Sequence, residues 1–199
     1  MALQQQMQRL SIYKYASAYV DVPFLMRFIL LFAGIYSFNW GYMALTDDRG
    51  HLYSTFLAQH LNYFAWLRWT IIHLANAMLH GVGVDSYIAD VFTLKAPNHH
   101  GVYVGPPCLG YGMISFWLAF VIAHDDLKGR KIMYSIAGVL LLWLLNCLRV
   151  AMLVYAVQKH WNVNRWMDHH TMFNTAVYLL TFLMIIGFYQ FRKGTEKTG

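Results

Sequence analysis

The fold is decided by residues 132–158, which read IMYSIAGVLLLWLLNCLRVAMLVYAVQ. Arg149 is the only charged side chain in this stretch. A helix needs about 20 mostly apolar residues to cross the hydrocarbon core of a bilayer. The stretch therefore predicts a membrane-spanning helix that carries one cation.

Three other stretches have the same character. Residues 28–46 and 171–191 contain no Asp, Glu, Lys or Arg, and residues 111–123 are shorter but equally uncharged. Only 12% of the 199 residues are charged, whereas soluble domains carry about 25%. We therefore predict an all-α integral membrane protein, a multi-pass bundle of about four or five membrane helices, folded as a single domain over residues 1–199.

A fifth segment, residues 69–84, allows two interpretations. Trp69, His73, Asn76 and His80 recur at helical spacing and form one polar stripe on an otherwise apolar helix. The helix either lies at the membrane interface or enters the membrane with this stripe turned toward protein. We favour the first interpretation, an extracytoplasmic amphipathic helix, because such helices bind in the interface plane.

The basic residues predict the direction of the helices, because Lys and Arg collect in short cytoplasmic loops. If four segments cross and residues 69–84 do not, three basic clusters lie in the cytoplasm: Arg9 and Lys14; Lys128, Arg130 and Lys131; and Arg192, Lys193 and Lys197. Residues 1–21 are then cytoplasmic or interfacial, residues 45–107 extracytoplasmic, and residues 192–199 a cytoplasmic tail. A fifth crossing would move the basic N-terminus outside. Since these residues are not gathered into one patch, the net charge of +6 does not predict binding to nucleic acid.

A small β-hairpin is expected in the extracytoplasmic region. Residues 91–94 and 102–104 are short β-rich runs, and the segment between them contains a Pro, an Asn and a Gly. This pattern is typical of two antiparallel strands joined by a turn.

The predicted topology brings a thiol, a guanidinium and an imidazole to one depth. Cys108 comes immediately before an inward-running helix, and His169 and His170 open the last one. Arg149 follows Ile132 by about 25 Å of outward-running helix at 1.5 Å per residue. All four residues are therefore expected near the extracytoplasmic surface.

These residue types suit nucleophilic catalysis. A thiol attacks carbonyl groups once it is ionised, and a neighbouring cation stabilises the thiolate. Cys108 would attack a peptide carbonyl, and His170, or His169 as the alternative, would act as the general acid and base. Arg149 would hold the thiolate or the developing oxyanion. Asn146, one turn before Arg149, would brace the guanidinium, and Asp168 would cap the last helix or orient a histidine.

Each residue also has a purely structural interpretation. Cys108 can be a small buried hydrophobe, which is the favoured interpretation of Cys147 in the middle of its helix. Arg149 can extend to the interface, although a cation in a membrane helix usually marks function. The histidines can be interfacial.

Two other function classes remain open at this point. His73 and His80, with His169 and His170 on another helix, could ligate haem or a metal in a redox protein. Alternatively, the chain could be a non-catalytic assembly or transporter subunit, in which Cys108 would be dispensable. We favour cysteine chemistry, which requires no cofactor and no metal.

Three motifs resemble the exosortase/archaeosortase family: GPPCLG (residues 105–110), NCLRVA (146–151) and DHHTMFN (168–174). The resemblance covers about residues 102–189. It implies a multi-pass enzyme of the cytoplasmic membrane, with a catalytic Cys, Arg and His on the extracytoplasmic side. By motif these are Cys108, Arg149 and His170, since His170 with Asn174 fits the family's spacing better than His169 does.

The resemblance also implies partners. Members recognise proteins that end in a short motif, a transmembrane helix and a basic tail, and they cleave at the motif. They are thought to pass the protein to a surface anchor, which implies membrane lipids and a lipid-linked acceptor as further partners. Gly110, Asn146, Asp168 and Asn174 are then supporting residues of the site. Leu109 stands where members usually have Ser, and Asn174 where they have Gly.

Overall fold

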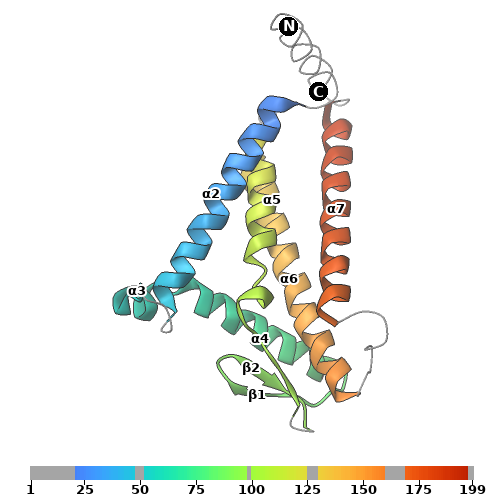
Figure 1. Ribbon diagram of the computed structural model, residues 1–199. Helices are drawn as coiled ribbons and strands as arrows, with labels where there is room; N and C mark the ends of the chain where they lie inside the picture. Colours follow the sequence, from blue (N-terminus) through green and yellow to red (C-terminus); the bar gives the residue numbers. More distant parts are fainter. Residues whose placement is uncertain (1–20, 48–51, 98–99, 125–129, 160–168, 197–199) are drawn as a thin grey trace, which may run out of the picture. The chain divides into compact units, whose positions relative to one another are not determined.

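The computed structural model describes residues 21–47, 52–97, 100–124, 130–159 and 169–196, with the side chains of residues 169–174, 176 and 190–196 left out (Figure 1). Its helices are α2 (Val22–Thr46), α3 (Thr55–His60), α4 (Tyr63–Gly81), α5 (Tyr111–Ala123), α6 (Lys131–Gln158) and α7 (His169–Glu196). The strands are β1 (Tyr87–Asp90), β2 (Thr93–Lys95) and β3 (Gly101–Tyr103), and a 3-10 turn, η1, covers Pro106–Cys108. The prediction of a mostly helical protein is confirmed.

Among the described residues, two helices are long and apolar enough to cross a membrane, namely α2 and α6. Helix α5 and residues Val177–Tyr189 of α7 are also apolar but shorter. Helix α2 begins at Val22 rather than at residue 28, because Asp21 caps it by accepting a hydrogen bond from the Phe24 N–H at 3.1 Å. The number of membrane crossings stays a prediction.

The chain divides into two compact units. The first contains residues 1–58 and 111–139, and the second contains residues 59–110 and 140–199. Helix α6 contributes its first turns to the first unit and its remainder, including Arg149, to the second. The prediction that residues 1–199 form one membrane domain is not decided by this division.

In the first unit, α2 packs along α5 through aromatic side chains. Phe24, Phe28, Phe32 and Tyr36 stand at intervals of four residues, so they form one column on α2. Their ring contacts on α5 are with Tyr111, Phe116 and Phe120, at centroid distances of 5.2 to 6.1 Å. A polar bond ties the pair together, because Asn39 Nδ2 donates to the buried Ser115 Oγ at 3.0 Å.

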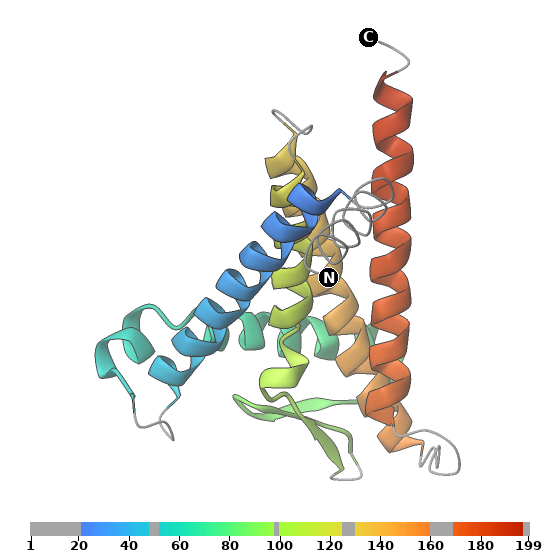
Figure 2. The same ribbon diagram turned by 45° about the horizontal axis from the view of Figure 1, so that its top comes forward.

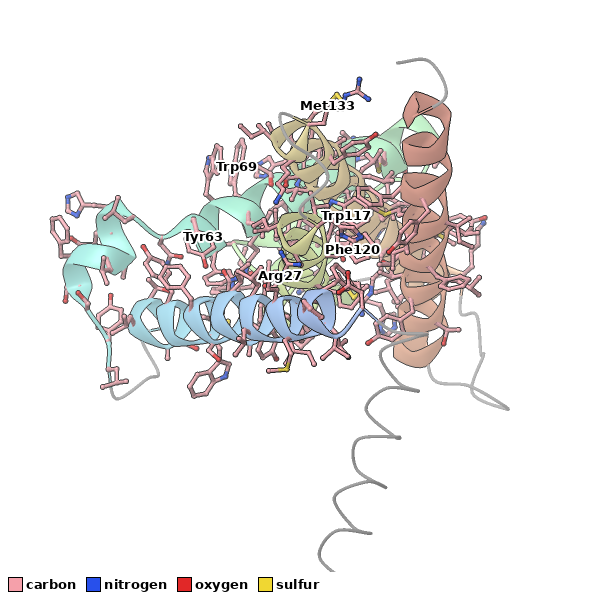
Figure 3. The ribbon with its side chains drawn as sticks, turned by 90° about the horizontal axis from the view of Figure 1, so that it is seen from above. Arg27, Tyr63, Trp69, Trp117, Phe120 and Met133 are labelled. Atoms are coloured by element: carbon pink, nitrogen blue, oxygen red, sulfur yellow. The ribbon has the colours of Figure 1, made fainter. Side chains whose placement is uncertain are left out.

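Trp117 of α5 holds the first turns of α6. Its Nε1 donates to the Tyr134 carbonyl at 3.1 Å, and its ring lies where a side chain at Gly138 would be. Figure 3 shows Trp117 beside Phe120 on α5, and their rings are 5.8 Å apart. Gly138 therefore permits the two helices to approach closely.

In the second unit, α4 is amphipathic, as predicted. Its buried residues follow helical spacing: Phe64, Ile71, Ile72, Ala75 and Leu79. Of the predicted stripe, Trp69, His73 and His80 are exposed and Asn76 is half-buried, so the stripe does not form the buried face. The outward position of Trp69 is visible in Figure 3.

Trp143 Nε1 of α6 donates to Thr70 Oγ1 at 3.1 Å, which joins α4 to α6.

An antiparallel sheet in the order β1-β2-β3 follows α4 (Figure 2). The predicted hairpin is confirmed as β2 and β3, with Leu94 opposite Val102. Strand β1 was not predicted, because its residues YIAD lack β-branched alternation and its pairing with β2 is irregular after Ile88. Helix α4 packs against β1 and β2, and Leu94 is completely buried.

Candidate active site around Cys108

Cys108 closes a tight turn after strand β3. The Cys108 N–H donates to the Gly105 carbonyl at 2.9 Å, and the Leu109 N–H donates to the Pro106 carbonyl at 3.1 Å. Two consecutive prolines limit the backbone freedom of this turn. The side chain of Cys108 is only 4% exposed, and its Sγ lies 4.0 Å from the Tyr103 carbonyl oxygen. The thiol is thus held at the end of β3.

Gly110, which follows this turn in the chain, packs against helix α6. Its φ is +71°, a conformation that residues with a Cβ adopt at a cost. A Cβ at Gly110 would also overlap the amide of Asn146, lying 2.9 Å from its Cγ and 3.2 Å from its Oδ1. Glycine is therefore required both by the backbone conformation and by the close approach of Asn146. The backbone just beyond Cys108 packs against the Asn146 amide.

Asn146 and Arg149 lie one turn apart on the same face of α6. Asn146 is 4% exposed, and its Nδ2 donates to the Leu142 carbonyl at 3.1 Å. Arg149 is 6% exposed. Its Nε is buried and has no hydrogen-bond partner within the described part of the chain. The predicted bracing of this guanidinium by Asn146 stays a prediction.

A buried guanidinium without a full set of hydrogen bonds is costly, because it has lost water and gained no equivalent partner. Such groups commonly mark functional sites. Within the described residues, Arg149 thus has a buried Nε without a partner, one turn from the residue that contacts Gly110. An Nε–H of this kind can donate to an anion or an oxyanion.

The predicted histidines lie at the start of α7. His169 is the first residue of α7, but the side chains of His169, His170 and Asn174 lie outside the described atoms, and Asp168 lies outside the described residues. The choice between the two histidines therefore stays a prediction, as do the roles of Asp168 and Asn174.

Arg68 of α4 is a supporting residue that the sequence analysis missed. Its Nε donates to the Val104 carbonyl at 3.1 Å, and its guanidinium lies 4.2 Å from the centre of the Phe92 ring. The Phe92 N–H donates to Asp90 Oδ1 at 2.7 Å, so it leaves the Val104 carbonyl to Arg68. Arg68 therefore fixes the last carbonyl before the GPPC turn. A cation inside an otherwise uncharged aromatic stretch was the available signal.

The histidines of α4 already have backbone partners. His73 Nδ1 is 2.8 Å from the Trp69 carbonyl, and His80 Nε2 is 2.8 Å from the Ser86 carbonyl. Over the described residues, no group of three or more His, Cys, Asp or Glu side chains is placed to hold a metal ion. These contacts do not decide the alternative of a haem or metal protein, because a ligating histidine commonly donates its other ring N–H to a backbone carbonyl. That alternative stays a hypothesis. Cys147 is completely buried, in keeping with a structural role.

The sequence model of the transmembrane exosortase family matches residues 10–187. No curated protein and no solved structure matches the chain significantly. The match includes Cys108, Asn146, Arg149 and both candidate histidines. Because it covers most of the 199 residues, the chain belongs to the transmembrane exosortase family and is a membrane protein.

Proposed function

We propose that this protein is a cysteine transpeptidase or peptidase that cleaves the C-terminal sorting signal of membrane-tethered proteins on the extracytoplasmic side of the cytoplasmic membrane. Its substrates carry a short motif, a transmembrane helix and a basic tail. The product is transferred to a surface acceptor, for which a lipid-linked nucleophile is the proposed class. Family membership supports this proposal.

The observation that carries the proposal is the contact between Gly110 and Asn146. It joins the turn that bears Cys108 to the face of α6 that bears Arg149. Arg149 has a buried Nε without a protein partner among the described residues. A thiol on one side of this junction and an available cation on the other are what acyl transfer requires.

The proposed reaction has two steps. In the first, Cys108 Sγ attacks the scissile carbonyl, and Arg149 stabilises the negative oxygen that forms. The peptide C–N bond then breaks, and His170 passes the thiol proton to the leaving amine. In the second step, an amine, a hydroxyl or water attacks the resulting thioester, and the carbon–sulfur bond breaks. His170 takes the proton of this nucleophile and returns it to the released thiolate.

The test is co-expression with a reporter protein fused to the C-terminal motif, helix and basic tail of a candidate substrate. We expect the wild type to shorten the reporter and the Cys108→Ala variant to leave it intact. The matched control is Cys147→Ala, since Cys147 is the other cysteine of the chain and is also buried. That variant should still process the reporter.

Two results would contradict the proposal. Unchanged processing by the Cys108→Ala variant would remove the nucleophile and favour a non-catalytic assembly role. Equal losses in the Cys108→Ala and Cys147→Ala variants, together with lower amounts of protein in the membrane, would indicate a packing role for both thiols.

An Arg149→Lys variant, which keeps the charge but loses Nε, should lower processing without changing the amount of protein.

A further inference from the structure

Strand β3 forms one edge of the sheet. The strand order is β1-β2-β3, so among the described residues β3 pairs with β2 on one side and with no strand on the other. Residues Gly101 and Tyr103 are exposed and Val102 is half-buried. An edge strand of this kind presents unpaired backbone groups to any extended chain that lies beside it.

The ladder shows which backbone groups face outward. The Ala96 N–H donates to the His100 carbonyl at 2.9 Å, and the Val104 N–H donates to the Phe92 carbonyl at 2.7 Å. Hydrogen-bonded pairs alternate along an antiparallel ladder, so Val102 pairs with Leu94 in the same way. The N–H and carbonyl groups of Gly101 and Tyr103 therefore point away from β2, toward the free edge.

Cys108 lies at the end of this edge. Its Sγ is 4.0 Å from the Tyr103 carbonyl oxygen, which is one of the outward-pointing groups. Neighbouring strands in a sheet are about 4.8 Å apart. A chain added along Gly101 and Tyr103 would thus bring its own backbone within reach of the thiol.

Three contacts hold the edge in place. The Tyr103 ring stacks on the Phe92 ring at 5.6 Å, and the Arg68 guanidinium lies on Phe92 at 4.2 Å. The same Arg68 binds the Val104 carbonyl directly after β3. Helix α4 thereby fixes the direction of β3 before any peptide arrives, which lowers the entropy lost on binding.

We propose that the free edge of β3 is the substrate-binding site, on which an extended segment of the substrate protein adds as a fourth strand. The segment pairs with the outward backbone groups of Gly101 and Tyr103, and its scissile carbonyl then reaches Cys108. This inference rests on the proposed function, since it assigns the binding mode of that same site.

Strand addition also explains how the covered thiol becomes available. Cys108 is 4% exposed, and its Sγ faces the Tyr103 carbonyl. A substrate N–H that donates to this carbonyl replaces the weak S–H donor. The thiol is then released toward the substrate carbonyl. Recognition comes from the peptide backbone, and side chains on alternate residues give specificity.

The test uses a fluorescent synthetic peptide that contains the segment preceding the helix of the candidate substrate. Its binding to the full-length Cys108→Ala variant in detergent is measured by fluorescence anisotropy. A series of peptides then carries an N-methyl group on each successive backbone nitrogen. We expect affinity to fall about two- to tenfold when the methyl group is on every second residue, because each of these N–H groups loses one hydrogen bond to β3. Methylation of the residues between them should change affinity little.

A pair of protein variants provides a matched control. Tyr103→Pro removes the outward N–H and the ring, whereas Tyr103→Ala removes the ring alone. The proline variant should bind the peptide more weakly than the alanine variant. If the proline variant fails to accumulate, the N-methyl series still decides the question.

The outcomes separate this inference from the proposed function. N-methyl effects without alternation, or equal binding by the Tyr103→Pro and Tyr103→Ala variants, would overturn the strand-addition site. If reporter cleavage still requires Cys108 in that case, the proposed function stands. Alternating N-methyl effects combined with cleavage that does not need Cys108 would support the binding site and refute the catalytic role.

Discussion

At the scale of single residues, the site depends on Gly110. Replacement by alanine places a Cβ at a φ of +71° and drives it into the Asn146 amide. The left-handed conformation alone costs about 1 to 2 kcal/mol for a residue with a Cβ, and the overlap adds to this. We expect Gly110→Ala to abolish reporter processing and to lower the melting temperature of the purified protein.

Two other glycines of the chain separate these causes. Gly83 has a φ of +74°, but no described atom lies within 4 Å of the position that a Cβ would take, so Gly83→Ala tests backbone strain alone. At Gly112 a Cβ would make an ordinary contact of 3.6 Å with Tyr36. Both alanine variants should process the reporter.

Adding Asn146→Ala to Gly110→Ala should restore part of the stability that Gly110→Ala loses. No recovery of the melting temperature would contradict the contact between the two residues.

Arg149 is a second residue on which the site depends. The sequence analysis favoured a catalytic role for it and left open an interfacial one. In the sequence it could have been a cation that extends to the interface. The structure buries it and leaves its Nε without a partner among the described residues. Burial of this kind favours a donor that binds a ligand over a cation that extends to the interface.

At the scale of elements, helix α4 holds the sheet that leads to Cys108. We expect Arg68→Lys to weaken this connection, because lysine keeps the charge but cannot both bind the Val104 carbonyl and lie flat on Phe92. Loss of a charged hydrogen bond costs about 1.5 to 3 kcal/mol. Reporter processing and the melting temperature in detergent should both fall.

The control for this variant is Arg27→Lys. Arg27 Nε also donates to a backbone carbonyl, that of Pro23 at 3.2 Å, but the acceptor lies in the same helix. Its replacement should leave processing intact. If Arg68→Lys behaves like Arg27→Lys, Arg68 does not position the turn.

At the scale of the whole molecule, the prediction concerns the membrane topology. Four crossings by α2, α5, α6 and α7, with α4 outside the bilayer core, place both termini in the cytoplasm. A green fluorescent protein fused to either terminus should therefore fluoresce, and alkaline phosphatase fused there should be inactive. Active phosphatase at the N-terminus alone would show a fifth crossing and overturn the assignment of α4 to the interface.

The sequence determined the class of protein and its long apolar helices. Long apolar runs without charges favour the bilayer, where the backbone groups must bond to one another and a helix satisfies them. Helices α2, α5, α6 and α7 could therefore be predicted from composition. The β2–β3 hairpin was predicted from its β-rich runs and turn residues. The motifs around Cys108, Arg149 and His170 led to the family, which the match over residues 10–187 then established.

Only the tertiary structure decided how the turn, the sheet and the helices meet. The contact of Gly110 with Asn146, the bond of Arg68 to the Val104 carbonyl and the edge position of β3 join residues that are far apart in the chain or depend on strand order. No local pattern encodes such contacts, because helical and strand periodicity show which face of an element is apolar but not what will cover it. Cys108 and a strand edge before it could therefore be proposed from the sequence, whereas the strand order decided that β3 is the edge strand beside the thiol.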